Sequence, residues 1–249
     1  MVLDRLAEAW LESVQGVDDY TVVGSEFTTH YKKVIGESGK PHFKSVTESG
    51  MSGMRMGTMS AGMGMSDWNE LRDRAGAVAR HVGMQTLRGE NHHVLLITDL
   101  NRLDAVNIGT GTRPDSIMMY VNPSNWTLSR VTIHGGDVAS GASGTVTPTI
   151  DFEDYRKVES LRIPFSTKVT MVGMTLDISP EQVAQAQAAL VQLEARMKDM
   201  PEGQRDMMMA QIKPQMERLQ KMADSGTLEQ VFTVESVTVN PGLPDSMFQ

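Results

Sequence analysis

Apolar and polar residues alternate along most of this chain with the two-residue period of half-buried β-strands. In residues 20–35, Val23, Phe27 and Tyr31 fall on one face, and polar residues between them fall on the other. Further segments with this alternation, or with short apolar runs, are residues 42–48, 92–99, 117–121, 126–134, 147–156, 163–174 and 230–239. Many strands joined by short turns, such as Asn122-Pro-Ser-Asn125, predict one antiparallel sheet rather than βαβ units.

Two segments outside the predicted strands show the spacing of amphipathic helices, with apolar residues three and four positions apart. In the segment that opens the chain, these residues are Leu3, Leu6, Trp10 and Val14. In the segment from Asp67 to Val82, they are Trp68, Leu71, Ala75 and Val78. Helices beside an antiparallel sheet place the chain in the α+β class.

Residues 179–226 interrupt the strand pattern and predict an antiparallel helical hairpin. Ser179 is a suitable N-cap, Pro180 fits the first helical position, and Gln182 stands three residues after the cap. Two stripes of apolar residues then follow at helical spacing, separated by residues 201–203. We expect this hairpin to be an insertion within a single domain of 249 residues. It either packs on the sheet or acts as a mobile lid or docking arm.

The composition excludes several classes of function. The chain carries 23 Lys and Arg against 31 Asp and Glu, a net charge of −8, and no basic run, so nucleic acid is not an expected partner. It has no cysteine, which excludes disulfides, thiolate zinc sites, iron–sulfur clusters and a cysteine nucleophile. No segment reaches the roughly 18 consecutive apolar residues of a membrane-spanning helix.

Patterns typical of catalytic sites are missing from the sequence. Gly36-Glu-Ser-Gly-Lys40 lacks the spacing of a phosphate-binding loop and reads as a hairpin turn. His92 and His93 are adjacent on a predicted strand, so their side chains point to opposite faces and do not suit one metal ion. Three carboxylates within residues 151–154 are typical of a solvated turn. We therefore expect a protein that is not an enzyme, with no catalytic residues, no metal triad and no cofactor.

The methionine-rich segment, residues 50–66, is the strongest chemical anomaly. Thioether side chains are apolar and adaptable, which suits a surface or lid that wraps an irregular apolar ligand. Packing in a loose core is a second interpretation, and binding of Cu(I) is a third, disfavoured because the segment contains no histidine. The candidate ligand-binding residues, including two from the helix that follows, are Met51, Met54, Met56, Met59, Met63, Met65, Trp68 and Leu71.

Four parts of the chain carry a family resemblance. They are the opening helix with Asp19-Tyr-Thr-Val, residues 120–130, residues 152–165 and residues 237–248. Their strand and turn patterns resemble the bacterial outer-membrane lipoprotein-sorting proteins, the LolA/LolB-like superfamily. The resemblance implies a strongly curved antiparallel sheet, an incomplete β-barrel, covered by helices. The hairpin at residues 179–226 is not part of the family pattern, and no residue here matches the arginine latch of the carrier.

The same resemblance implies a function and a location. It implies a non-enzymatic carrier that holds the acyl chains of lipids or lipoproteins in an apolar trough, in the periplasm or at the outer membrane. It also implies a native export signal upstream of Met1. Two other classes stay open: a periplasmic methionine-rich copper-binding protein, and an envelope sensor domain that binds a protein partner.

Overall fold

The computed structural model describes residues 2–25, 27–36, 39, 41–49, 72, 76, 78–98, 115–135, 142–143, 147–173, 175–176 and 225–248. These residues are mostly β, with one α-helix and a ten-stranded sheet. The helix and the strands of the sheet are α1 (Val2–Ser13), β1 (Asp19–Gly24), β2 (Phe27–Ile35), β3 (Pro41–Ser49), β4 (Ala79–Leu87), β5 (Glu90–Ile97), β6 (Ser116–Asn122), β7 (Thr127–His134), β9 (Thr147–Val158), β10 (Leu161–Val172) and β12 (Thr227–Val239). A separate ladder joins β8 (Ala142–Ser143) to β11 (Thr175–Leu176), and a 3₁₀ helix, η2 (Asp245–Phe248), follows β12.

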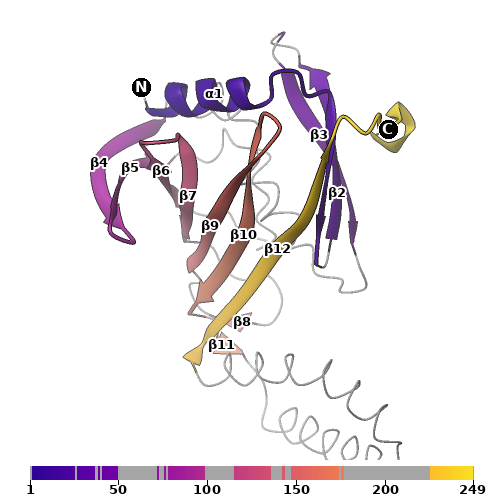
Figure 1. The fold of residues 1–249 in the computed structure, drawn as a ribbon. Coiled ribbons are helices and arrows are strands. Elements are labelled where there is room, and N and C mark those ends of the chain that lie inside the picture. Colours follow the sequence, from indigo (N-terminus) through magenta and orange to yellow (C-terminus); the bar gives the residue numbers. More distant parts are fainter. Residues whose placement is uncertain are drawn as a thin grey trace, which may run out of the picture.

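The strands of the sheet lie in the order β3-β2-β1-β12-β10-β9-β7-β6-β5-β4, and every neighbouring pair is antiparallel. β3 and β4 are the two edges, so the sheet is not closed into a barrel. Figure 1 shows the sheet curving strongly from β4 at one side to β2 and β3 at the other, with α1 across one end. The predicted curved, open antiparallel sheet is confirmed. Within the described ranges its helical cover is α1 rather than several helices.

The core lies between α1 and the face of the sheet that this helix covers. Leu3, Leu6 and Trp10 of α1 are buried, as their helical spacing predicts. Alternate strand residues, such as Ile150 and Phe152 of β9, belong to the same cluster of buried side chains. Each large apolar side chain that is fully buried contributes about 1.5–3 kcal/mol. Helix and sheet therefore stabilise each other through this one apolar face.

The predicted strand over residues 20–35 is in fact two strands, β1 and β2, paired as a hairpin. Gly24 makes the reversal possible, because a Cβ at this position would press on a neighbouring ring and lie 2.8 Å from the carbonyl oxygen of Thr233. The reversal changes the phase of the pattern. Val23 and Tyr31 therefore lie on opposite faces of the sheet instead of sharing one.

The predicted helix over residues 67–82 is wrong at its C-terminal end, where residues 79–82 begin strand β4. The ladder that β4 forms with β5 overrides the helical spacing of the apolar residues. A bulge between His81 and Gly83 adds one extra residue, Val82, to β4. The bulge breaks the two-residue alternation of β4, so no strand pattern is visible there in the sequence.

The carboxylates of residues 151–154 do not form the expected solvated turn. Asp151 lies within β9 and is only 5% exposed. The guanidinium of Arg130 donates two hydrogen bonds to it, from Nε to Oδ1 at 2.7 Å and from Nη2 to Oδ2 at 3.0 Å. Nη2 of Arg88 lies 2.6 Å from the same Oδ1. The hydrogen bond to Asp151 raises the pKa of Arg130, and this cross-strand pair supports the register of β7 against β9.

Three predicted segments lie wholly or mostly outside the described residues. They are the methionine-rich segment, the part of the predicted helix before β4, of which only residues 72, 76 and 78 are described, and the helical hairpin, of which only residues 225 and 226 are described. The single domain of 249 residues therefore stays a prediction. None of the helices described here is long and apolar enough to cross a membrane.

Candidate functional site

Two hollows lie along α1, between the helix and the sheet, and Trp126 lines both of them. The helix-start hollow is lined by Val2, Leu3, Arg5, Gly76, Ala79, His81, His93, Leu95 and Trp126. The helix-end pocket is lined by Ala9, Trp10, Glu12, Ser13, Val14, Tyr20, Asn125, Trp126, Thr127, Leu128, Tyr155, Lys157, Ser160, Leu161, Arg162 and Ile163. Concave sites of this kind are where small ligands bind in most proteins, so the two hollows are the candidate site.

Trp126 is placed by the turn between β6 and β7. Asn122 accepts two hydrogen bonds of 2.9 Å in this turn. Its side-chain Oδ1 accepts one from the Ser124 amide, and its backbone carbonyl oxygen accepts one from the Trp126 amide. Asn125 Oδ1 in turn accepts hydrogen bonds from the amide and the hydroxyl of Thr127. Trp126 has a φ of 53°, a left-handed conformation that a tryptophan adopts only when its surroundings impose it. The predicted turn is confirmed, and it presents an indole ring between the two hollows.

The helix-start hollow has a volume of about 390 Å³ and mainly apolar walls. Leu3 of α1 and Leu95 of β5 are almost fully buried, and Ala79 of β4 adds a small side chain to the wall. The indole of Trp126 stacks on the His93 ring, with centroids 5.6 Å apart and 17° between the planes. This volume lies within the range of about 300–1,000 Å³ that small-molecule pockets occupy.

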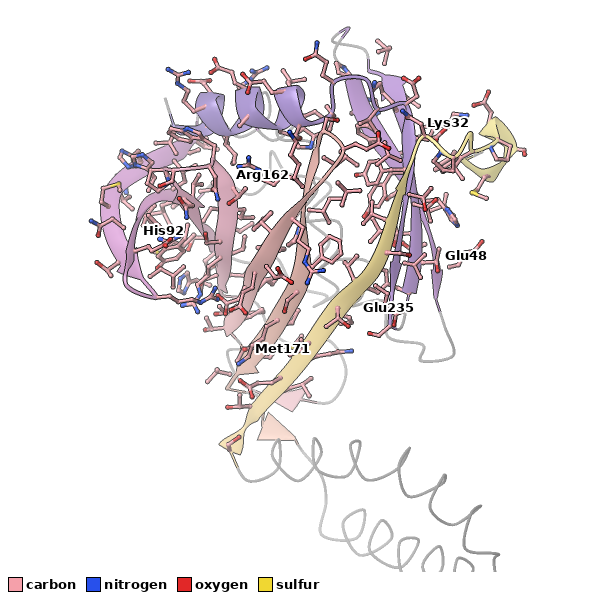
Figure 2. All side chains as sticks on the ribbon, viewed as in Figure 1. Lys32, Glu48, His92, Arg162, Met171 and Glu235 are labelled. Carbon is pink, nitrogen blue, oxygen red and sulfur yellow. The ribbon has the colours of Figure 1, made fainter. Side chains whose placement is uncertain are left out.

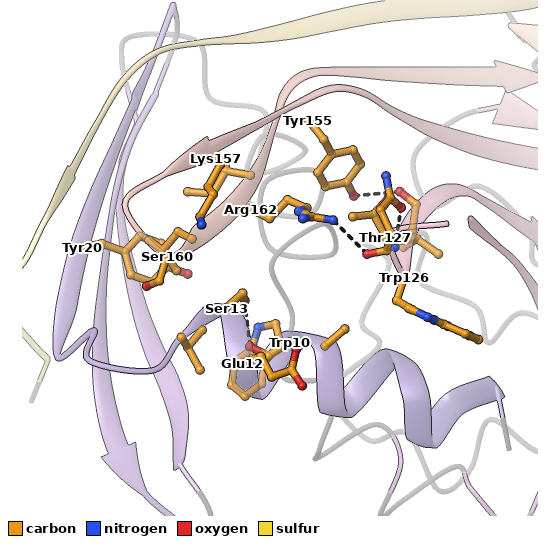
Figure 3. Close-up of a pocket in the computed structure, with 16 residues that line it drawn as sticks. Trp10, Glu12, Ser13, Tyr20, Trp126, Thr127, Tyr155, Lys157, Ser160 and Arg162 are labelled. Atoms are coloured by element: carbon orange, nitrogen blue, oxygen red, sulfur yellow. Dashed lines mark hydrogen bonds between the residues drawn. The ribbon is translucent and has the colours of Figure 1, made fainter. Parts of the chain in front are cut away.

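The helix-end pocket is smaller, about 280 Å³, and more polar. Figure 3 shows Lys157 and Arg162, from the β9–β10 hairpin, on the opposite side of this pocket from Glu12 of α1. Arg162 Nη1 donates a hydrogen bond of 3.0 Å to the carbonyl oxygen of Asn125. This end of the site therefore carries two cationic side chains, Lys157 and Arg162, and one carboxylate, Glu12.

Two titratable groups of the site, His93 and Tyr155, have pKa values shifted by burial. Burial, and then the neighbouring His81, lower the pKa of His93, so its imidazole is neutral at neutral pH. Burial raises the pKa of Tyr155 far above neutrality, and its hydroxyl donates a hydrogen bond of 2.7 Å to the Leu128 carbonyl oxygen. The site therefore presents mainly apolar and aromatic surface at one end, with Arg5 on its wall, and Lys157, Arg162 and Glu12 at the other.

The eight predicted binding residues, which fall within residues 51–71, all lie outside the described residues, so that prediction is untested. The opposite orientation of the two adjacent histidines is confirmed. His92 is buried and hydrogen-bonded to Ser129 Oγ at 2.9 Å and to the carbonyl oxygen of Glu90 at 3.0 Å. His93 lines the helix-start hollow on the other face.

The residues that line the two hollows are not recognisable as one site in the sequence. The turn sequence before Trp126 was a usable signal, because it predicts that the ring stands at a strand end. His81 gave no such signal, since only the bulge in β4 brings it beside His93. Arg162 and Lys157 look like ordinary exposed strand residues until the β9–β10 hairpin is placed against α1.

The chain was compared with known proteins. No family model matches it, and no curated protein matches it in sequence. A DUF1329 family protein from Desulfovibrio piger covers 99% of this chain and 97% of its own at 10% identity and a TM-score of 0.44. A putative outer membrane lipoprotein-sorting protein domain from Vibrio parahaemolyticus has the same coverage and TM-score at 9% identity. A LolA superfamily protein from Nitrosomonas europaea covers 98% of this chain and 97% of its own at 10% identity and a TM-score of 0.37.

Proposed function

We propose that this protein is a non-enzymatic binding or carrier protein for lipids or acylated lipoproteins. The observation that carries the proposal is the helix-start hollow, whose apolar walls come from both α1 and the sheet. Beside it, and sharing Trp126, lies the more polar helix-end pocket. An amphiphile has a matching arrangement, because its apolar chain suits the helix-start hollow and its polar head suits the helix-end pocket. The sequence resemblance to the lipoprotein-sorting superfamily points to the same class of ligand.

The apolar end supplies the binding free energy in this proposal. Each methylene group that leaves water contributes about 0.8 kcal/mol, so even a short acyl segment in the hollow gains several times that amount. Leu3, Leu95 and Trp126 are held by the core, so little ordering is needed when a ligand enters. An acyl chain is therefore a better fit to the hollow than a polar metabolite.

The polar end selects the head of the ligand. Lys157 and Arg162 favour an anionic or strongly polar group, and Glu12 reduces the net charge there to about that of one cation. We infer binding and release without chemistry. We place the protein in the periplasm or at the outer membrane.

Native mass spectrometry of freshly purified protein tests this function. We expect adducts whose masses correspond to fatty acyl lipids and that disappear on extraction with organic solvent. Extracted protein should then bind a fluorescent fatty acid, with a change in tryptophan emission. Protein that carries no acyl adduct and binds no fatty acid probe would refute the proposal. Purification together with a protein partner but no lipid would favour the sensor class.

A pair of matched variants locates the ligand. Ala79→Phe places a ring into the helix-start hollow and should weaken binding of the fatty acid probe at least tenfold, because it occupies the space of several methylene groups. Val231→Phe makes a comparable change at an exposed position, 52% accessible, on β12 away from both hollows, and should leave binding unchanged. Equal effects of the two variants would show that the hollow is not the site.

A further inference from the structure

A cluster of nitrogen and sulfur side chains lies at the β4–β5 edge of the sheet. His81 and Met84 belong to β4, and His93 belongs to β5. Neither the acyl-binding proposal nor the methionine-rich segment uses this combination. Two of its members, His81 and His93, line the helix-start hollow, and Met84 is 47% exposed.

The two imidazoles face each other through ring nitrogens. His81 Nε2 lies 3.2 Å from His93 Nδ1, and the ring planes are 71° apart. Two nitrogens that each lie about 2.0–2.1 Å from one tetrahedral metal ion are separated by about 3.3 Å. The observed separation is therefore that of two ligands of a single ion. The same separation is also compatible with a hydrogen bond between the two rings.

The bulge in β4 determines which side chains share a face with His93. Val82 is the extra residue, and Gly83, with a φ of 116°, provides a conformation that other residues rarely adopt. Counted from the β4–β5 hairpin turn, Met84 pairs directly with His93, so their Cβ atoms lie about 4.5–5.5 Å apart on one face. Without the bulge, His81 would stand opposite Leu96 and point to the other face. With it, His81 stands opposite Leu95, on the face of His93 and Met84. The bulge thus places one thioether and two imidazoles on the same face at this edge of the sheet.

We propose that His81, Met84 and His93 form a binding site for the soft monovalent ion Cu(I). Imidazole binds several transition metals, but a thioether ligand selects the soft cuprous ion over Zn²⁺. Neutral imidazoles carry one ring proton each. With these protons on His81 Nδ1 and His93 Nε2, both facing nitrogens are free to coordinate.

The surroundings permit a cation at this point. Arg5 is the charged residue on the wall of the helix-start hollow, and its Nη1 lies 3.2 Å from Glu8 Oε2, which offsets its charge. The Trp126 ring stacks on His93 and adds the negative face of its π-system nearby. The stacked indole also supplies a local reporter, because an ion bound to His93 changes the fluorescence of Trp126.

Titration with Ag⁺, an air-stable ion with the same soft preference, tests the site, and Zn²⁺ serves as the harder comparison. We expect one equivalent of Ag⁺ to shift the NMR signals of the His81 and His93 rings and of the Met84 methyl group, and to change Trp126 emission. Competition with a chromogenic cuprous chelator then gives the affinity for Cu(I). Ag⁺ that binds elsewhere without moving these three sets of signals would overturn the proposal.

Single substitutions separate the ligands. His93→Gln should weaken Ag⁺ and Cu(I) binding at this point by at least about tenfold, since even the loss of a supporting partner of a metal ligand costs 10–100-fold. Met84→Leu should weaken Ag⁺ binding similarly while leaving Zn²⁺ binding unchanged. The controls His42→Gln and Met171→Leu change the same residue types on β3 and β10 and should have no effect; Figure 2 shows Met171 far from the β4–β5 edge. Unchanged Ag⁺ binding in Met84→Leu, or equal losses for Ag⁺ and Zn²⁺, would refute the assignment to Cu(I).

Discussion

Replacing Asp151 by Asn tests whether the buried ion pair between β7 and β9 stabilises the fold. The substitution preserves shape but removes the charge, and one of the two oxygens that bind Arg130 becomes a donor. Breaking a fully buried pair costs about 3–5 kcal/mol. The Arg130 and Arg88 side chains are 30% and 42% exposed, so water partly compensates them, and we expect a loss of about 2–3 kcal/mol.

Urea unfolding followed by tryptophan fluorescence measures this loss, and a double-mutant cycle with Arg130→Met isolates the pair. For a chain of this size, each kcal/mol also lowers the melting temperature by about 2–4 °C. Asp154→Asn is the matched control on the same strand, because Asp154 binds Arg156 at 2.6 Å in an exposed pair. We expect no measurable change from this control.

Two results would show that the Asp151–Arg130 pair does not stabilise the fold as expected. A coupling energy below about 0.5 kcal/mol between Asp151 and Arg130 would mean that the pair is no more stabilising than a surface ion pair. A loss in Asp154→Asn as large as that in Asp151→Asn would mean that burial does not set the effect. Either result would remove the argument that this pair supports the register of β7 and β9.

Three further predictions concern single contacts. Tyr155→Phe should lower the free energy of unfolding by about 1 kcal/mol, measured in urea, because it removes one buried hydrogen bond. Gly24→Ala should cost about 1–3 kcal/mol in the same assay, since the new methyl group would overlap its neighbours, including the Thr233 carbonyl oxygen, and no change would mean that the β1–β2 reversal relaxes freely. His81→Gln should raise the pKa of His93 in an NMR titration, but not to the ordinary value, because burial is the larger cause of the shift. Since folding favours neutral His93, its contribution to stability should fall as pH drops through the ordinary histidine pKa, and His93→Gln should flatten that dependence.

Much of the fold could be predicted because burial on one face gives a strand its two-residue alternation. β2 and β7 were found in this way, β6 was found from its short apolar run, and the spacing of Leu3, Leu6 and Trp10 identified α1. The alternation did not predict the structure correctly where a reversal or a bulge interrupts the two-residue period of a strand. A reversal at Gly24 split one predicted strand into two, and the bulge at Val82 disguised the start of β4 as the end of a helix.

The candidate site was less predictable, because its parts meet only in three dimensions. Trp126 follows a recognisable turn, but nothing in its local sequence indicates that α1 lies against it. Asp151 looked solvated because sequence neighbours suggest a turn, whereas its actual neighbours are Arg130 of β7 and Arg88 of the β4–β5 turn. Likewise, His81 and His93 are twelve residues apart and meet through a ladder register that no sequence pattern encodes.

The position of β12 constrains the order in which this protein can fold. This strand, formed by residues 227–239, pairs with β1 on one side and with β10 on the other, and it is the link between the β1–β3 and β4–β10 parts of the described sheet. Until it arrives, β1 and β10 are open edges in addition to β3 and β4, and such edges invite pairing with other chains. Pairing across more than 200 residues is also slow to form. During synthesis β1 therefore has no partner on its β12 side until one of the last strands has been made, which leaves an interval in which these edges are open to chaperones.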